Sequence, residues 1–276
     1  MKFSTKAKLA VQEIVPPFLW KILKKLNKSE EYGFFGDYSS WEDAMKDSVG
    51  YDSDIILNKV KNSLLQVKEG KAIYERDSVL FDEIEYSFPV LAALLKIALE
   101  NDGKLSVLDF GGSLGSSYYQ CKDFLGNVKE LHWSIVEQPK FVECGKQYFE
   151  NDQLKFYENI EICLKHEKPD VILLSSVIQY LEKPYEFLED LLEYDFSCIL
   201  IDRTIFLSHG TTSLTIHVVH PDIYEASIPT WFLDLKNISK ILLSKYDLII
   251  SFDSFSGKIS WNNNLIEDKG FFYKKR

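Results

Sequence analysis

The chain has 276 residues, 46% of them hydrophobic and 14% aromatic, which is enough for one sizeable core with an appendage. A net charge of −10 without a concentrated basic groove argues against non-specific binding to nucleic acid, which requires neutralisation of phosphates. No apolar run reaches the length of a bilayer span and no apolar signal core opens the chain, so we expect a cytoplasmic protein.

Residues 1–30 form a basic region unlike the remainder of the chain. Its first 28 residues hold seven lysines and one acid, Glu13. After Pro16 and Pro17, the apolar residues between positions 18 and 26 fall on one face of a predicted helix. We favour packing of this helix on the domain or on a partner subunit. Contact with the anionic inner face of a membrane is the alternative.

Residues 31–100 are expected to form a helical cap. Ser40 is a typical N-cap for a helix that begins at Trp41, and a stripe of apolar residues predicts a second helix over 55–68. A strongly apolar third helix is predicted over 88–99.

Charged residues are concentrated between the second and third predicted helices, at Glu75, Arg76 and Asp77. Two interpretations stay open. The three side chains can form a capping and salt-bridge cluster at the start of a helix over 78–85. Alternatively, Glu75 or Arg76 reaches into a cleft from the cap.

The stretch 106–119 organises the rest of the chain. A short apolar run that ends with Asp109 and Phe110 reads as a buried strand, and the segment after the glycines can turn helical. A strand, a glycine turn and a helix present backbone N–H groups to a ligand in open α/β sheets. The glycines, which can adopt positive φ and let a ligand approach the backbone, are Gly111, Gly112 and Gly115.

The next predicted strand, residues 132–137, ends on an acid. The glycine spacing differs from the G-x-G-x-x-G fingerprint of dinucleotide-binding sheets, so the glycines alone are a weak signal. Glu137 lies a little over twenty residues beyond them, where a carboxylate can accept both hydroxyls of a ribose. The alternative is a solvated acid at a strand end, and we favour the ribose interpretation.

The remaining chain continues the alternation of strands and helices. Further strands are predicted over 154–157, 170–177 and 197–204, an antiparallel pair over 247–255 and 270–273, and helices over 139–149, 184–192 and 231–246. An insertion is expected over 205–229. We therefore predict a Rossmann-like α/β domain over 101–276, with a mostly parallel sheet and an antiparallel last strand.

The sequence resembles class I S-adenosylmethionine (SAM)-dependent methyltransferases. The motifs that carry the resemblance are 107–115, 134–137 and 169–181. The departure is at Gly112–Gly115, where the usual pattern is Gly-x-Gly-x-Gly. The resemblance implies SAM as cofactor, with binding by Asp109, Ser175 and Glu137 and by the three glycines.

A narrower resemblance rests on Gly36–Trp41, Gly50-Tyr51, Tyr74–Asp77 and Tyr224–Trp231. These phrases are similar to those of a bacterial methyltransferase family that is often encoded among surface-polysaccharide genes. It implies a small, sugar-derived or phosphorylated acceptor in surface-glycan biosynthesis, and it covers the chain from about Trp20 onward.

The acceptor side of the site is predicted in the loops after the fourth and fifth strands. Tyr180 either faces the cleft or packs under the cap. Arg203 can bind an anionic acceptor bidentately, and the alternative is a salt bridge with a nearby carboxylate. A histidine is a candidate general base near neutral pH, and His209 is preferred over His217 and His220. No third ligand is spaced for zinc or iron, so we expect no metal.

The sequence thus predicts a SAM-dependent methyltransferase that uses Tyr180, Arg203 and His209 on the acceptor side. Two alternatives remain: a non-catalytic methyltransferase-like scaffold at a membrane, and an NAD(P)-dependent sugar-modifying enzyme. The absence of a Tyr-x-x-x-Lys pair after the fourth strand argues against the second alternative. Oligomerisation is open.

Overall fold

The computed structural model describes residues 32–50, 54–208, 210–220, 223, 225–261 and 264–276. The basic region 1–30 lies outside these residues, so its amphipathic helix stays a prediction. Within the described ranges, no helix is both long enough and apolar enough to cross a membrane.

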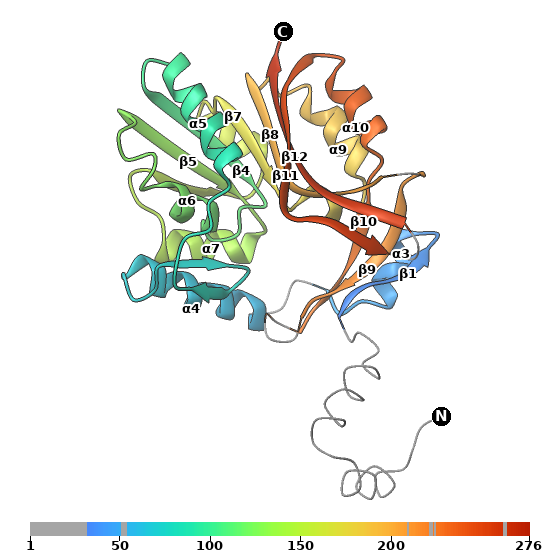
Figure 1. Cartoon of the computed structure of the whole chain (residues 1–276). Coiled ribbons are helices and arrows are strands. Elements are labelled where there is room, and N and C mark those ends of the chain that lie inside the picture. Colours follow the sequence, from blue (N-terminus) through green and yellow to red (C-terminus); the bar gives the residue numbers. More distant parts are fainter. Residues whose placement is uncertain (1–31, 51–53, 209, 221–222, 224, 262–263) are drawn as a thin grey trace, which may run out of the picture.

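A seven-stranded sheet forms the centre of the molecule (Figure 1), with the order β11-β12-β8-β7-β4-β5-β6. The five strands from β6 to β8 run parallel, and β12 is antiparallel to both β8 and β11. This confirms the predicted Rossmann-like sheet with an antiparallel last strand. The strands are β4 (Lys104–Phe110), β5 (Glu130–Val136), β6 (Leu154–Tyr157), β7 (Val171–Ser175), β8 (Cys198–Leu207), β11 (Tyr246–Trp261) and β12 (Asn264–Lys275).

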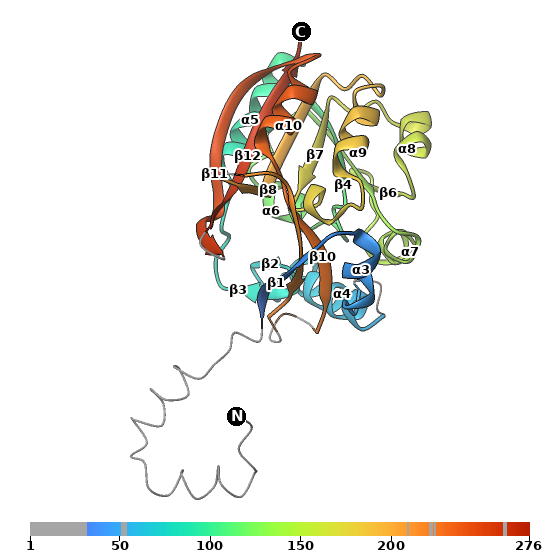
Figure 2. The ribbon, with the colours of Figure 1, turned by 90° about the vertical axis from the view of Figure 1, so that its right-hand side faces the viewer.

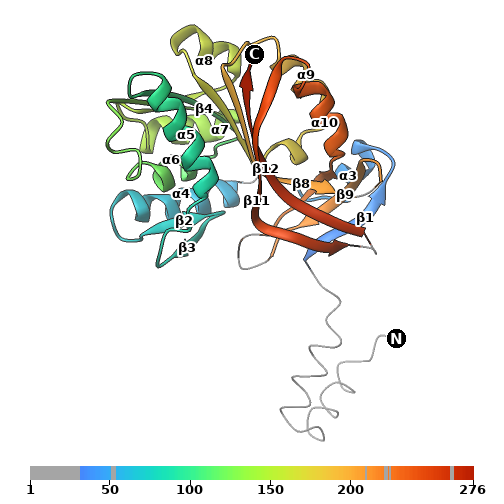
Figure 3. The ribbon, with the colours of Figure 1, turned by 45° about the horizontal axis from the view of Figure 1, so that its top comes forward.

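Helices cover both faces of this sheet (Figure 3). On one face lie α5 (Phe88–Glu100), α6 (Ser116–Cys121) and α7 (Pro139–Tyr148), and on the other α8 (Ile160–His166), α9 (Pro184–Leu191) and α10 (Leu235–Leu242). Strands buried on both faces need continuous apolar runs, as in β7, where Val171 to Leu174 are at most 1% exposed.

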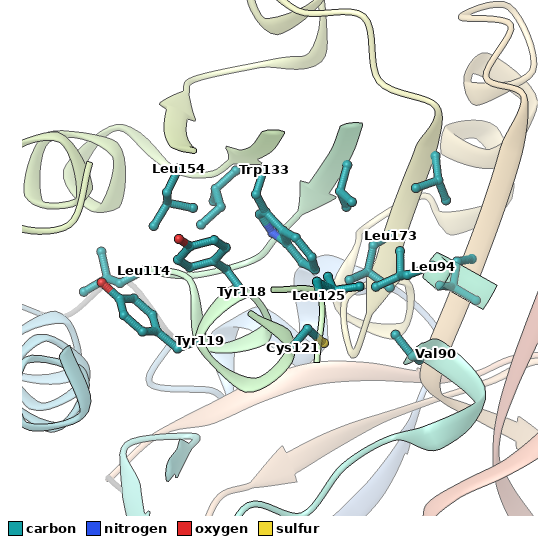
Figure 4. Packing of buried hydrophobic residues seen from close by; sticks show 14 of the residues in the cluster. Val90, Leu94, Leu114, Tyr118, Tyr119, Cys121, Leu125, Trp133, Leu154 and Leu173 are labelled. Carbon is teal, nitrogen blue, oxygen red and sulfur yellow. The ribbon is translucent and has the colours of Figure 1, made fainter. Parts of the chain in front are cut away.

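Trp133 of β5 anchors the first of the two core layers. It is completely buried, and Tyr118 of α6 packs against it edge-to-face with ring centroids 6.0 Å apart. Figure 4 shows Leu94 and Val90 of α5 in the same cluster as Leu173 of β7. The glycine turn between β4 and α6 therefore lies directly against this core layer.

A second, three-stranded antiparallel sheet has the order β1-β9-β10 and lies below the central sheet (Figure 2). Its strands are β1 (Gly33–Tyr38), β9 (Ser213–Val218) and β10 (Ser227–Phe232). The predicted helix over 231–246 is wrong at its start, because Trp231 belongs to β10 and α10 begins only at Leu235. The insertion thus supplies β9, which pairs with β1 at the start of the cap region on one side and with β10 on the other.

The cap region contains the expected helices α3 (Trp41–Lys46), with Ser40 as N-cap, and α4 (Asp54–Lys68). It also contains a hairpin of β2 (Tyr74–Arg76) and β3 (Val79–Phe81). The helix proposed over 78–85 does not form. Asp77 and Ser78 instead adopt φ of 52° and 65°, as the two central residues of a type I′ hairpin turn require.

Candidate active site

A cavity of about 630 Å³ lies beyond the carboxyl ends of the parallel strands, where open α/β sheets bind their ligands. The strand ends and following loops of β4, β5, β7 and β8 line one side. The hairpin β2–β3 and strands β9 and β10 line the other side. The cavity thus lies between the central sheet and the part of the molecule built from the cap and the insertion.

The glycine turn shapes one wall of the cavity, but its glycines serve internal packing. A Cβ on Gly112 would lie 2.5 Å from Cγ of Asp109, and a Cβ on Gly111 would lie 2.6 Å from Val177. Gly111 and Gly115 have φ of 71° and 109°, which favour glycine. Gly115 faces the core and is not among the described residues that line the cavity.

Asp109 is a deeply buried acid of the cavity wall, with 1% of its surface exposed. Burial raises the pKa of its carboxyl to about 7, although the hydrogen bond from Trp133 acts in the opposite direction. The group therefore ionises fully only when a cation or a donor approaches it or when the pH is raised.

Glu137 follows the last residue of β5 and lines the same end of the cavity, as the sequence predicts. Burial raises the pKa of this carboxyl as well. Its Oε2 accepts a hydrogen bond of 2.6 Å from the backbone N–H of Gln138. Its own backbone N–H donates to the backbone carbonyl of Tyr157. The carboxylate is held at the strand tip, where it can accept hydroxyl donors from a ligand.

Arg203 projects from β8 among polar partners. Its Nε donates to Oγ of Ser175 at 3.2 Å, and its guanidinium lies 3.8 Å from the carboxylate of Asp77 on the hairpin turn. The two predicted roles of Arg203 are binding of an anionic acceptor and a salt bridge with a nearby carboxylate. Both are compatible with this position, since the ion pair with Asp77 is long and Arg203 and Asp77 both line the cavity. Ser175 is placed next to Arg203, at the end of β7.

Tyr180 ends the short 3₁₀ helix η1 (Ile178–Tyr180) and lines the cavity. Its hydroxyl lies 3.2 Å from Nδ1 of His217, which belongs to β9. His209, the histidine preferred from sequence, lies outside the described residues, so its role stays a prediction. The structure brings His217, the less favoured candidate, to the cavity wall.

Glu75 lines the cavity from the hairpin, and Arg76 of the same hairpin forms an ion pair with Glu85 at 2.7 Å, so both interpretations of this charged run have a matching contact. The Glu75 carboxylate accepts hydrogen bonds from the backbone N–H of Ser78, at 3.0 Å, and from the hydroxyl of Ser116 at the start of α6. Burial raises its pKa to about 7. The hairpin and the glycine turn are therefore joined by a buried acid.

Acidic side chains outnumber basic ones in the cavity lining, although burial raises the pKa of several of these acids. Among the described residues, its basic side chains are Arg76 and Arg203, and its acids are Glu75, Asp77, Asp109, Glu137, Glu158 and Asp202. Such a lining favours a ligand that carries positive charge over one that carries a pyrophosphate. In the described part of the chain no group of three or more His, Cys, Asp or Glu is arranged to hold a metal, and the expectation of no metal stays a prediction.

Two contributions to the site were not foreseen. The sequence around Trp133 predicts only a core residue, yet its indole N–H donates a hydrogen bond to Asp109. No local sequence pattern reveals such a contact between neighbouring strands. The turn residues Asp77 and Ser78 separate two short runs with aromatic and β-branched members, which is a hairpin signal that could have placed Glu75 on a strand.

No model of a known protein family matches the sequence, and no curated protein matches it. Solved structures of similar fold include the N-terminal domain of EvdMO1, crystallised in the presence of SAH and D-fucose. The TM-score is 0.47 at 11% identity, with 79% of this chain and 97% of that chain covered.

Two further solved structures match at 12% identity with a TM-score of 0.41 each. One is magnesium protoporphyrin IX methyltransferase from Synechocystis PCC 6803 with bound SAH, and the matched region covers 68% of this chain and 83% of that chain. The other is a SAM-dependent methyltransferase from Clostridium acetobutylicum, and the matched region covers 67% of this chain and 90% of that chain. Identities this low say nothing about the substrate, so the chemistry of the site rests on its own residues.

Proposed function

We propose that the chain transfers a methyl group from SAM to a small-molecule acceptor. The observation that carries the proposal is one acidic cavity at the carboxyl ends of the strands. The Asp109–glycine turn and Glu137 lie at the ends of β4 and β5, Tyr180 and His217 meet between the central sheet and the second sheet, and Arg203 of β8 is close enough to Asp109 to lower the pKa of its carboxyl. In this proposal the donor binds at the ends of β4 and β5, and the acceptor binds beside Tyr180 and His217.

The residues at the donor end fit the chemistry of SAM. When bound, SAM supplies an electrophilic methyl group on a positively charged sulfonium, and its amino group adds a second positive charge. Asp109 and Glu75 are buried acids whose ionisation a cation would favour, because an opposite charge within a few ångströms lowers a raised carboxyl pKa. Glu137 is placed to accept the two ribose hydroxyls.

Positioning supplies most of the rate acceleration in such a displacement, since acceptor and methyl group must be held in line. In this proposal the parallel strands and the hairpin hold the donor, and the second sheet contributes His217 on the acceptor side. Glu75 fixes the hairpin to the central domain, because its carboxylate accepts a hydrogen bond from Ser116 of α6. Enclosure by the hairpin also limits the access of water to the reacting atoms.

The acceptor in this proposal is a small sugar-derived or phosphorylated compound in surface-glycan biosynthesis. Arg203 and Arg76 line the cavity, and a guanidinium can hold a phosphate or carboxylate through two parallel hydrogen bonds. The glycan context itself rests on the sequence resemblance described above.

Calorimetric titration tests the donor assignment. The full chain and its Glu137→Ala variant are titrated with SAM, S-adenosylhomocysteine (SAH) and NAD, and Glu42→Ala, an exposed acid on α3, is the control. We expect micromolar binding of SAM and SAH and a loss of about tenfold or more in Glu137→Ala, equivalent to about 1.4 kcal/mol. Binding of NAD alone would indicate a dehydrogenase or epimerase, and no binding of any of the three would favour a scaffold.

A further inference from the structure

We propose that Tyr180 and His217 form a proton-relay pair that removes the proton of an acceptor hydroxyl, so that the reaction is an O-methylation. The inference rests on the proposed function and deepens it, because it names the chemical class of the accepting atom. It also makes His217 the histidine that acts behind Tyr180, whereas the sequence pointed first to His209.

The two side chains meet at the wall of the cavity. The Tyr180 hydroxyl lies 3.2 Å from Nδ1 of His217, and the two rings are nearly parallel, at 20°, with centroids 6.3 Å apart. Both residues line the cavity, and they come from opposite sides of it. Tyr180 follows β7 of the central sheet, while His217 lies on β9 of the second sheet.

Aromatic packing fixes the orientation of the imidazole. Phe34 of β1 stacks on the His217 ring at 4.7 Å between centroids, and Phe232 of β10 packs edge-to-face on Phe34 at 4.9 Å. Trp261 donates its indole N–H to the backbone carbonyl of Phe34 at 3.2 Å. A side chain held in this way directs one ring nitrogen at a single partner, which a general base requires.

The surroundings keep the imidazole in its basic form. Burial lowers the pKa of His217, and the Asp77 carboxylate on the hairpin turn opposes this effect. Its partners across the ladders in β1 and β10 are the apolar Phe34 and Ile228, and the titratable group that faces it from η1 is Tyr180. At neutral pH the lone pair on Nδ1 is therefore available to accept the phenolic proton.

The step balances in protons and electrons. The acceptor O–H bond breaks and its proton passes to Oη of Tyr180, while the phenolic proton of Tyr180 passes to Nδ1 of His217. The acceptor oxygen forms a bond to the methyl carbon, and the electron pair of the broken carbon–sulfur bond returns to sulfur. The resulting imidazolium of His217 then releases its proton to solvent.

In this scheme Tyr180 is a catalytic residue and His217 is a positioning residue that acts through it. An amine that is already deprotonated, or a carboxylate, would need no such pair, because a base assists only when the nucleophile has a proton to lose. The presence of a neutral, oriented imidazole behind a phenol at the acceptor end therefore points to a hydroxyl.

Kinetics of single and double variants test the pair. Tyr180→Phe and His217→Gln are assayed with SAM over sugar phosphates and nucleotide sugars with free hydroxyls, beside amino-sugar analogues. His132→Gln is the control, because His132 lies on β5 outside the cavity and bonds to Glu130. We expect loss of kcat by about 100-fold or more in each single variant, no further loss in the double variant, and SAH affinity within about twofold.

Two outcomes would overturn the relay. One is an unchanged kcat in His217→Gln with the acid limb of the pH–rate profile still in place, and the other is transfer of the methyl group to nitrogen. Normal SAH binding in these variants would leave the methyltransferase proposal standing while the relay fails. Absence of SAH binding by the unsubstituted chain would overturn both.

A spectroscopic measurement tests the pair without an acceptor. In the SAH-bound protein labelled with 15N-histidine, His217 is expected as the Nε2–H tautomer, with Nδ1 accepting a hydrogen bond. The Nδ1 resonance should shift in Tyr180→Phe and stay unchanged in His132→Gln. An Nδ1–H tautomer, or no response to Tyr180→Phe, would contradict the relay.

Discussion

The indole N–H of Trp133 donates a hydrogen bond of 3.1 Å to Oδ2 of Asp109, and at most 1% of either residue is exposed. The bond joins adjacent parallel strands, β5 and β4, on the side of the sheet where Trp133 packs into the core. Asp109 is thus positioned by a residue that never reaches the ligand. The hydrophobic core and the candidate donor site share this one contact.

Replacing Trp133 by Phe should lower the free energy of unfolding by about 2–4 kcal/mol. The substitution removes the donor to a buried carboxyl and leaves a small void in the core. Urea denaturation of the ligand-free protein measures the effect. Trp41→Phe, at the start of α3, is the matched control and should cost less than half as much. An equal loss in both variants would show that the bond to Asp109 contributes little.

Neutral isosteres of the two buried acids should stabilise the ligand-free protein. Glu75 and Asp109 have pKa values of about 7, raised by burial, so the folded state holds protons that the unfolded state has released. The free energy of unfolding therefore falls as the pH rises from about 4 towards about 7, and stays low above that range. Glu75→Gln and Asp109→Asn remove this penalty.

We expect each variant to gain about 1–3 kcal/mol at pH 8 and little at pH 4, in urea titrations at both pH values. Glu42→Gln, an exposed position on α3, should change neither value. Stabilisation of equal size at both pH values would point to a packing effect instead of the cost of ionising a buried acid.

The affinity for SAM should increase with pH across the neutral range. The cationic ligand favours the ionised forms of Glu75 and Asp109, whose pKa values lie near 7 without it, so binding at pH 6 must first displace protons. Calorimetry at pH 6 and pH 8 should give affinities that differ by about tenfold or more. The dependence should flatten in the double variant Glu75→Gln/Asp109→Asn. Stronger binding at pH 6 would contradict the assignment of these acids to the donor end.

Arg203→Lys should raise the KM for a phosphorylated acceptor by about tenfold and change the Kd for SAM by less than about twofold. Lysine retains the positive charge but loses the planar fork that binds a phosphate bidentately. Asp77→Asn is the matched variant, since it releases Arg203 from its 3.8 Å ion pair and should lower the same KM. A rise in the SAM Kd without a change in KM would place Arg203 at the donor end instead.

The sequence was a good guide to the central sheet and to the strand ends that carry Asp109 and Glu137. The apolar strands and the glycine turn are local signals, and β6 has the predicted bounds, 154–157. The parallel topology then brings Asp109 and Glu137 to the same edge without further information, because both follow from the ends of adjacent strands.

The acceptor end could not be predicted in the same way, because it depends on contacts between distant segments. β9 pairs with β1 on one side and with β10 on the other, and nothing near His217 in the sequence reveals that Phe34 will stack on it. Trp231 was assigned to the start of a helix over 231–246. The edge position next to β9 makes it a strand instead, so tertiary pairing prevails over local propensity.

The bond between Trp261 and Phe34 joins residues that are 227 positions apart along the chain. During synthesis, β1 therefore emerges from the ribosome long before β9, β10 and the closing strands exist. Its edge has no partner in its own sheet until β9, Ser213–Val218, has been made. Pairings of such long range are slow to form and leave strand edges open in the meantime. The acceptor end should accordingly be the last part of the site to mature, and a growing chain that already holds the complete donor end would still lack methyl-transfer activity.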